Sequence, residues 1–265
     1  MKYVFGVDIG GTTVKIGLFD VEGNVLDKWE IPTRTENDGE EILPDVADSI
    51  REKMKQMDKD AIAGVGVGAP GPIDAGGVVH RAVNLGWKTF NVKETLEALI
   101  NLPVRAGNDA NVAALGEMWM GGGKGYKDLV VVTLGTGVGG GIIVDGRMIS
   151  GSTGAAGEIG HIHVDDTETD VCNCGNKGCL EQFASATGIT RLANKKLAST
   201  DMDSVLRGGE VSAKTVFDAV KARDPLAMEV AEQFGKYLGD ALAAVAGVVN
   251  PEAFVIGGGL SLIHI

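Results

Sequence analysis

Three cysteines lie close together in the sequence and offer the chemistry of a metal site. Cys172, Cys174 and Cys179 fall within eight residues, and Gly175 and Gly178 between them allow sharp bends. Three thiolates on such a turn, joined by one histidine, make the Cys₃His set that holds Zn²⁺ in a tetrahedron. An odd number of clustered cysteines does not make a secreted disulfide framework. The alternative to a metal site is a group of reduced, inert thiols.

The spacing leaves the fourth zinc ligand open. His161 and His163 are the histidines nearest to the cysteines, and residues two apart in an extended segment point the same way, so sequence alone does not choose between them. Zinc with four protein ligands keeps no open position, so we expect a structural ion that fixes its neighbours. Glu158 and Glu181 flank the cysteine segment, and carboxylates beside an imidazole suit a ring of sugar hydroxyls.

Two glycine-rich turns, each between short apolar runs, have the composition of phosphate-binding hairpins. The first spans residues 10–13 just after Asp8, and the second spans residues 135–141. Glycine has no Cβ atom, so consecutive N–H groups can point into a concavity that accepts phosphate oxygens. Hydroxyl groups stand beside the glycines at Thr12, Thr13 and Thr136. We expect Asp8 to hold Mg²⁺ through water. The alternative is a pair of ordinary tight turns.

The same glycines disfavour two other nucleotide sites. Gly135, Gly137 and Gly140 match the dinucleotide fingerprint as a string, but that fingerprint needs a helix after its glycines. Residues 142–145 instead have the pattern of a strand. The chain also contains no Walker sequence, Gly-x-x-x-x-Gly-Lys-Ser/Thr. A nicotinamide enzyme and a Walker-type site are therefore not expected.

Asp109 is the candidate general base. It lies in the sequence Asn108-Asp109-Ala-Asn, between a short apolar strand at 104–106 and a helical run at 112–120. A carboxylate at such a junction can accept the proton of an incoming hydroxyl, which is nearly all the covalent chemistry that phosphoryl transfer asks of a protein. The alternative is that Asp109 caps the helix.

Strands and helices must position these groups, and the first half of the chain predicts them in a clear order. Residues 3–8 and 14–19 read as a β-hairpin, and residues 25–31 as a third strand. A helix follows, with Asp38 and Glu41 as a capping box. Apolar residues recur along one face of that helix at Ile42, Val46, Ile50 and Met54. A buried strand is expected at residues 62–68.

The second half repeats this theme. Residues 128–134 and 142–145 flank the second glycine turn, and residues 147–149 give a further strand. Asp224 and Pro225 start a long helix that stops at Asn250, before one more strand from residue 254. The repetition predicts a duplicated α/β architecture with a cleft between two lobes. We expect a smaller lobe at residues 1–118 and a larger one, with the cysteines, at residues 119–265.

Composition limits where the protein works. The chain has 265 residues, 44% of them hydrophobic, which is enough to bury a sizeable core. No run approaches the roughly 20 apolar residues that cross a bilayer, and the N-terminus does not resemble a signal peptide, so we expect a cytoplasmic protein. A net charge of −12 has the wrong sign for binding nucleic acid or an anionic membrane.

Taken together, these motifs closely resemble the ROK family of sugar kinases and repressors. The resemblance runs from about residue 3 to residue 259 in the family's order. Its motifs are Asp8-Ile-Gly-Gly-Thr-Thr, Gly68-Ala-Pro-Gly-Pro-Ile-Asp74, Asn108-Asp-Ala-Asn, Leu134-Gly-Thr-Gly-Val-Gly-Gly-Gly-Ile142, Glu158-Ile-Gly-His161, Cys172-x-Cys-Gly-x-x-Gly-Cys-x-Glu181 and Val255-Ile-Gly-Gly-Gly259. Within the family, the sequence looks most like a bacterial glucokinase.

The resemblance implies an actin-like ATPase fold of the ribonuclease H-like type, with ATP and Mg²⁺ as co-substrates and a structural zinc. It implies that Asp109 is the base and that His161 is the zinc ligand that also touches the sugar, leaving His163 as a bystander. The sugar-binding positions that it implies are Gly71, Asn84, Asn108, Asp109, Glu158, His161 and Glu181. The ATP-binding positions are Asp8, Gly10, Gly11, Thr12, Thr13, Lys15, Gly135, Thr136, Gly137, Gly257, Gly258 and Gly259. Trp87, near Asn84, matches the same family segment, although a lone tryptophan more often packs in a core.

Two departures from the family pattern matter. Family repressors carry a helix-turn-helix domain before the first glycine hairpin, and Asp8 leaves no room for one here. Family kinases continue beyond Gly259 into helices on the adenine side of the cleft, whereas residues 261–265 do not look like family sequence, so we expect an incomplete or foreign end.

The resulting expectation is phosphorylation of the 6-hydroxyl of glucose by a homodimeric kinase. The alternatives are a kinase for another hexose or an N-acetylhexosamine (fructose, mannose, N-acetylglucosamine or N-acetylmannosamine), and a non-catalytic sugar sensor that uses the same cleft. More remote is a zinc protein whose hairpins are only turns.

Overall fold

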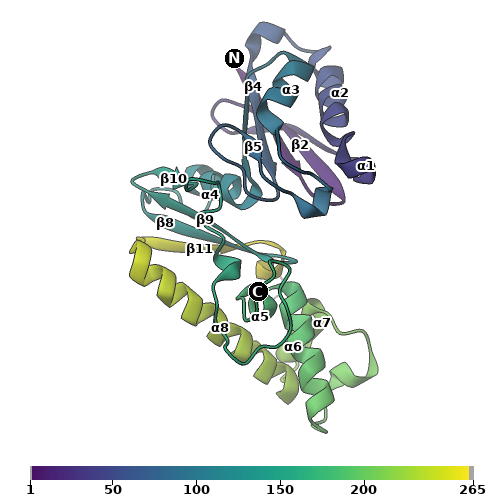
Figure 1. Ribbon diagram of the computed structural model, residues 1–265, viewed down its shortest axis with the longest axis vertical. Helices are drawn as coiled ribbons and strands as arrows, with labels where there is room; N and C mark the ends of the chain where they lie inside the picture. Colours follow the sequence, from purple (N-terminus) through teal and green to yellow (C-terminus); the bar gives the residue numbers. More distant parts are fainter. Residues whose placement is uncertain (1, 263–265) are drawn as a thin grey trace. The chain divides into compact units, whose positions relative to one another are not determined.

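The computed structural model describes residues 2–262, which form two compact units (Figure 1). The first unit contains the chain up to residue 124 together with residues 148–156. The second contains residues 125–147 and the chain from residue 157 onward. Each unit has its own α/β layers and its own hydrophobic core.

A five-stranded mixed sheet forms the first unit, in the order β3-β2-β1-β4-β7. The first three strands pair antiparallel, whereas β4 and β7 continue the sheet parallel to β1. The expected hairpin and third strand are therefore confirmed. The bounds are Tyr3–Ile9 (β1), Thr13–Asp20 (β2), Val25–Pro32 (β3), Ile62–Ala69 (β4) and Val104–Asn108 (β7), with the short pair Val78–Val79 (β5) and Phe90–Asn91 (β6) apart from this sheet.

The helices at residues 42–54 and 92–100 cover one face of this sheet and give the unit its core, whereas the helix at residues 109–120 packs against the other face. The residues expected on the inner face of the second helix are all buried, as the repeat of four predicted: Ile42, Val46, Ile50 and Met54. They join Phe5, Val7 and Ile9 of β1 in one cluster. The helices are Glu36–Gly39 (α1), Ile42–Met54 (α2), Val92–Ile100 (α3) and Asp109–Met120 (α4), and the 3₁₀ turns are Lys59–Ala61 and Val83–Leu85.

The expected capping box at Asp38 and Glu41 is wrong. Asp38 has a left-handed backbone, with φ of 59°, and its carboxylate accepts a hydrogen bond from Lys88 Nζ at 2.5 Å. Glu41 is itself the residue that precedes α2, and its side chain caps nothing. The chain turns sharply at residues 37–39 before the helix begins, so the two acids are not placed as Ncap and N3.

The opposite face of the sheet is partly open. A cavity of about 980 Å³ lies there, and Asp8 and Lys15 are among the residues that line it. The ring of Phe19 lies across Gly17, where a Cβ atom would come within 2.6 Å of it. Trp119 of α4, also in the lining, is 52% exposed.

The second unit repeats the strand plan of the first. Its sheet has the order β10-β9-β8-β11, in which β9 pairs antiparallel and β11 parallel with β8, and the edge strand β10 spans the boundary between the two units at residues 147 and 148. The same hairpin and parallel neighbour occur as β2-β1-β4 in the first unit, so the predicted duplication is confirmed. Its strands are Leu129–Leu134 (β8), Val138–Val144 (β9), Arg147–Ile149 (β10) and Ala253–Gly257 (β11), and its helices are Glu181–Ala184 (α5), Ala186–Ser199 (α6), Ala213–Lys221 (α7) and Pro225–Val249 (α8), with 3₁₀ turns at Ile159–His161, Val205–Gly208 and Gly259–Leu262.

Asp224 begins the long helix α8, as predicted. Its carboxylate accepts hydrogen bonds from the backbone N–H groups of Ala227 at 3.0 Å and Val205 at 2.8 Å, and from the hydroxyl of Ser204 at 3.1 Å. Burial alone would raise the pKa of Asp224, but these donors outweigh burial and lower it. The side chain therefore joins the start of α8 to the turn before α7.

Replacing Asp224 with alanine is expected to lower the free energy of unfolding by about 2 kcal/mol, since a helix cap and a buried acceptor are lost together. Asp240→Ala, on the exposed side of the same helix, should change it by less than about 0.5 kcal/mol. Because the pKa is lowered by folding, the contribution is present above the unfolded value of about 3.9 and is lost as the pH falls through the folded pKa. Urea denaturation at several pH values measures this, and a difference independent of pH would contradict it.

Within the described residues, no helix is both long and apolar enough to cross a membrane. The expectation about the end of the chain concerns residues 261–265, of which residues 263–265 lie outside the described part.

Candidate functional site

The first unit gathers polar groups at one end of its parallel strands. Asp8 of β1 stands beside Gly68 of β4, and Gly68 stands beside Gly107 of β7 in the pairing register. Asn108 ends β7, and Asp109 starts α4. Parallel strands present their carboxyl ends at the same edge, where α/β proteins commonly bind ligands. Asp8 and Asp109 therefore lie at one edge of the sheet.

Asn108, rather than Asp109, caps helix α4. The side-chain oxygen of Asn108 accepts a hydrogen bond from the N–H of Asn111 at 3.1 Å, and its side-chain amide donates to the carbonyl of Gly71 at 3.1 Å. The alternative that Asp109 serves as the cap is thus wrong. Asp109 occupies the first helical position with an exposed side chain, and one of its oxygens accepts from the N–H of Ala110 at 2.8 Å.

Asp8 and Asp109 influence each other electrostatically. The carboxylate of Asp8 reaches solvent but is surrounded by protein atoms, and this desolvation raises its pKa. Lys15, its partner across the β1–β2 pair, works in the opposite direction, whereas the negative charge of Asp109 raises the pKa of Asp8 further. Two neighbouring carboxylates with one lysine are suited to hold a hydrated divalent cation.

The first glycine turn is tied down at its ends. Gly10 N–H donates to the carbonyl of Thr13 at 3.0 Å, and the hydroxyl of Thr33 donates to the carbonyl of Gly10 at 2.7 Å. Thr12 and Gly11 remain exposed between these contacts, and a Cβ atom on Gly11 would lie 3.8 Å from the carbonyl oxygen of Asn84. The turn and Asn84 therefore lie side by side.

Two other positions from the sequence analysis, Gly71 and Trp87, have different roles. Gly71 has φ of 88°, and a Cβ atom there would come within 2.2 Å of the carbonyl oxygen of Arg81, so only glycine fits. Trp87 is buried, with 3% of its surface exposed, and its ring N–H donates to the carbonyl of Gly39 at 3.0 Å. Trp87 is thus a core residue of the first unit.

In the second unit, the glycine turn at residues 135–137 rests on the start of helix α6. Gly135 N–H donates to the carbonyl of Gly137 at 3.0 Å, which closes the turn. The N–H of Ala186 donates to the carbonyl of Gly135 at 2.8 Å, and the hydroxyl of Thr187 donates to the carbonyl of Thr136 at 2.8 Å. A strand follows, as expected, although β9 begins at Val138 rather than at residue 142, because residues 138–141 pair with β8 instead of continuing the turn. The dinucleotide arrangement is therefore absent here.

The turn at residues 257–259 lies at the same end of this sheet, because Gly257 of β11 pairs with Thr133 of β8. Gly258 has φ of 94°, and a Cβ atom there would come within 2.4 Å of the carbonyl oxygen of Leu134. Gly259 has nothing within 4 Å of the same position. The backbone of the turn therefore packs directly on the end of β8.

These two neighbouring glycines allow a matched test. Gly258→Ala is expected to lower the free energy of unfolding by about 2 kcal/mol, because it meets both a left-handed backbone and a backbone oxygen. Gly259→Ala should change it by less than about 0.5 kcal/mol. Denaturation without nucleotide measures both, and equal effects of the two substitutions would contradict the packing described for Gly258.

Glu181 lies between the second glycine turn and the cysteine segment. One carboxylate oxygen accepts from the N–H of Val138 at 3.4 Å, and the other accepts from the Sγ of Cys172 at 3.5 Å. A Cβ atom on Gly137 would come within 2.4 Å of the same carboxylate. Glu158, half-buried, directly precedes the 3₁₀ turn that ends at His161.

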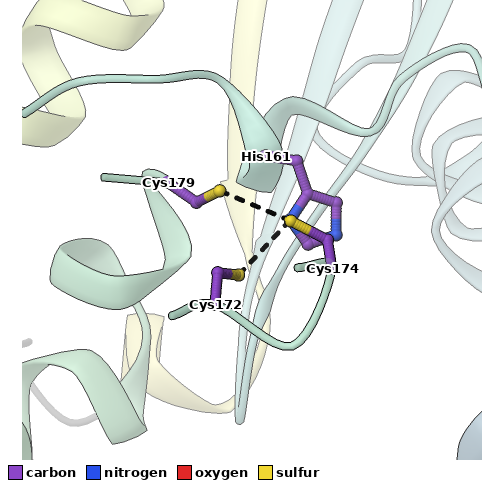
Figure 2. Close-up of side chains that lie close together, drawn as sticks. All are labelled: His161, Cys172, Cys174 and Cys179. Atoms are coloured by element: carbon purple, nitrogen blue, oxygen red, sulfur yellow. Dashed lines mark hydrogen bonds between the residues drawn. The ribbon is translucent and has the colours of Figure 1, made fainter. Parts of the chain in front are cut away.

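The structure brings His161, Cys172, Cys174 and Cys179 together (Figure 2). One ligand atom from each lies within 4.8 Å of all the others. Cys172 Sγ is 3.8 Å from His161 Nδ1, and Cys174 Sγ is 3.6 Å from Cys179 Sγ. Zinc–sulfur bonds of about 2.3 Å in a tetrahedron place sulfurs about 3.8 Å apart. The four side chains therefore fit a zinc ion.

The backbone of the cysteine segment explains this convergence. Cys172 N–H donates to the carbonyl of Asn176 at 2.7 Å, and Gly175 N–H donates back to the carbonyl of Cys172 at 2.8 Å. Burial is the first cause that raises the pKa of Cys179, to about 12, and the neighbouring thiols add to it. Burial likewise raises the pKa of Cys172. Metal binding must therefore displace protons from these thiols.

His163 points to other partners. The expectation that His161 and His163 point the same way is wrong, because residues 159–161 form a 3₁₀ turn rather than an extended segment. The ring of His163 contacts the carbonyl of Lys177 at 2.9 Å and the carboxylate of Asp166 at 2.8 Å. These hydrogen bonds raise the pKa of His163, that with Asp166 most of all.

Sequence reasoning missed two residues that contact the cysteine segment and the residues before it. Gln182 and Arg191 form a network with residues 168–170. They come from neighbouring helices, α5 and α6, across a break at Ser185, and no periodic pattern connects them.

The fold and these motifs define a family. The family model described as "ROK family" matches residues 4–264, and the chain belongs to this family. Its fold is accordingly the actin-like ATPase fold.

The relatives include both kinases and a repressor. The chain is 44% identical over 267 residues to a glucokinase from Halalkalibacterium halodurans, covering 98% of this chain and 81% of the relative. It is 31% identical to a xylose repressor from Caldicellulosiruptor bescii, covering 96% and 65%. A solved ROK family glucokinase from Streptomyces griseus, in complex with glucose and AMPPNP, superimposes with a TM-score of 0.80 at 34% identity, covering 98% and 84%.

Proposed function

We propose that this protein is an ATP-dependent sugar kinase that transfers the terminal phosphoryl group of ATP to the 6-hydroxyl of glucose. The observation that carries the proposal is the position of Asp109. Asn108 takes over the capping of α4, so the exposed carboxylate of Asp109 stands at the carboxyl edge of the sheet, beside Asp8. The glucokinases among its relatives, at 36 to 44% identity, support the class of enzyme.

In the proposed reaction, Asp109 accepts the proton of the sugar hydroxyl as that oxygen attacks the terminal phosphorus of ATP. The bond from this phosphorus to the bridging oxygen of ADP breaks as the bond to the sugar oxygen forms. Positioning and charge stabilisation supply most of the catalysis in such transfers. Asn108 supports this geometry, since its side chain ties the start of α4 to Gly71.

The glycine turns are proposed to bind the phosphates of ATP. The residues proposed to surround the phosphates are Gly10, Gly11, Thr12 and Thr13 in one unit, and Gly135, Thr136, Gly137 and Gly257–Gly259 in the other. The N–H groups of Gly10 and Gly135 close their own turns, so the other N–H groups and the hydroxyls are proposed to bind phosphate oxygens. Asp8 is proposed to hold Mg²⁺ through water, with Lys15 beside it. These groups offset the negative charge on the transferring phosphoryl group.

Sugar-binding residues are proposed in each unit. Gly71, Asn84, Asn108 and Asp109 belong to the first unit, and Glu158, His161 and Glu181 to the second. The cysteines and His161 are proposed to hold a structural zinc, which supplies fixed geometry and no reaction step. His161 and Glu181 would then face the sugar from a rigid loop.

A second candidate is a sugar sensor without catalysis, favoured by the xylose repressor among the relatives. A coupled assay with glucose, mannose, fructose, N-acetylglucosamine and N-acetylmannosamine separates these functions. Turnover highest with glucose supports the proposal, and turnover highest with another sugar replaces the substrate. If a sugar raises the melting temperature but no sugar is phosphorylated, the protein is a sensor.

A cytoplasmic location, a homodimeric assembly and the lack of a nucleic-acid or membrane partner belong to the same proposal. The net charge of −12 supports the last of these, because like charges repel a phosphate backbone or an anionic membrane.

A further inference from the structure

Gln182 connects the two ends of the cysteine segment. Its side-chain oxygen accepts a hydrogen bond from the N–H of Cys179 at 3.1 Å, and its side-chain amide donates to the carbonyl of Asp170 at 3.0 Å. Residue 170 precedes the first cysteine and Cys179 is the last, so one buried amide closes the whole segment. Gln182 is only 9% exposed, and both of its side-chain polar ends are used.

Arg191 of α6 contacts both the backbone of Gln182 and the acidic residues that precede the first cysteine. Its Nε and Nη2 donate to the carbonyl of Gln182 at 3.2 and 2.8 Å. Its Nη1 donates to the carboxylates of Glu168 at 2.6 Å and Asp170 at 3.0 Å. A planar guanidinium can serve these acceptors at once, whereas a lysine ammonium is a single point charge.

The surroundings of this guanidinium make the network stiff. Glu168 has a side chain that is only 5% exposed, and Lys195, one turn along α6, is 3.1 Å from the same carboxylate. The carbon of the Arg191 guanidinium lies 5.1 Å from the centre of the Phe183 ring. A partly buried guanidinium that is paired with carboxylates and packed on a ring holds its neighbours more firmly than an exposed ion pair does.

We propose that Arg191 and Gln182 are positioning residues that hold the cysteine segment in the geometry that binds zinc. Neither side chain is among the four proposed ligands. They orient Cys179 through its backbone and Cys172 through residue 170, so that the thiols need not be gathered when the ion binds. Residues that orient metal ligands typically affect metal affinity by about 10- to 100-fold. The inference rests on the zinc site of the proposed function and needs neither sugar nor ATP.

The test measures zinc release from the full chain loaded with zinc, using a chromophoric chelator. Arg191→Met is expected to lower zinc affinity by about 10- to 100-fold. The zinc affinity of Arg191→Lys should lie between those of the wild type and Arg191→Met, since lysine keeps the charge but loses the paired contacts to the backbone carbonyl of Gln182. Gln182→Met keeps the size of the side chain and removes both of its hydrogen bonds, so it should also lower zinc affinity by about 10- to 100-fold. This variant tests the proposal on its own if Arg191→Met does not fold.

Lys196→Met is the matched control, because it removes one cation from the same helix, where Lys196 pairs with Glu229 instead. A second measurement separates positioning from general packing: the rise in melting temperature when zinc is added to metal-free protein. We expect the zinc-induced rise in melting temperature to be smaller than that of the wild type in Arg191→Met and Gln182→Met, and unchanged in Lys196→Met.

Two results would overturn the proposal, and they differ in meaning. If Arg191→Met and Gln182→Met keep the zinc affinity and the zinc-induced rise of the wild type, these residues do not position the ligands. If the wild-type chain binds no zinc, the proposed metal site fails, and the inference fails with it. A chain that binds zinc but phosphorylates no sugar would refute the proposed kinase activity alone.

Discussion

Asp109→Asn is expected to lower kcat by about 10²-fold or more while sugar binding persists. The amide cannot accept a proton at the attacking oxygen, and removal of a general base typically costs 10²- to 10⁴-fold. The fold should tolerate the change, because Asn108 provides the cap of α4 and Asp109 is exposed. A coupled assay of ADP formation gives kcat, and the sugar-induced rise in melting temperature reports binding.

The control is Asp48→Asn, an equally conservative change at an exposed position of α2, where the carboxylate pairs with Arg51 on the surface of the same helix. Its kcat should match that of the wild type. An unchanged kcat in Asp109→Asn would remove this residue from the mechanism. A loss of sugar binding equal to the loss of kcat would instead assign Asp109 to binding.

Cys174→Ser is expected to abolish stoichiometric zinc and to raise the KM for sugar by about 10-fold or more. A serine hydroxyl is a poor zinc ligand, and the remaining three side chains would no longer enclose the ion. Because the ligand set includes His161, loss of the ion should free the imidazole that is proposed to face the sugar. Elemental analysis gives the zinc content, and initial rates give the KM.

Chelation of the wild type provides the comparison. Metal-free wild type should show the same rise in KM and should recover when zinc is restored, whereas Cys174→Ser should not recover. Purified wild type that contains no zinc would break the proposed link between metal and sugar. Loss of zinc with an unchanged KM would confine the ion to a role in stability.

Much of the fold follows from local rules in the sequence. Asp224 and Pro225 start α8 because an acidic cap and a preset φ suit the first turn of any helix. The inner face of α2 follows from the spacing of its apolar residues, and all four are buried. The glycine hairpins could be placed for the same reason: short apolar runs joined by glycine have few other solutions.

The errors arose where tertiary contacts decide the backbone. Asp38 failed as a cap because its segment turns left-handed and its carboxylate meets Lys88, which is fifty residues away in the chain. Asn108 and Asp109 are both good caps by residue type, and only the hydrogen bond from the N–H of Asn111 to the side chain of Asn108 shows which one is used. Arg191 gave no local signal, since its partners are spread over residues 168–182.

The strand plan shared by the two units also bears on how such a chain can arise. Each unit contains a hairpin joined to a parallel neighbour, built from dissimilar residues. Doubling of one ancestral gene, followed by fusion, accounts for this economically. The two halves now differ in what this shared plan carries, since the first has two neighbouring aspartates and the second has the cysteine segment. In such a lineage, the functional residues of one half can change while the fold of the other half stays the same.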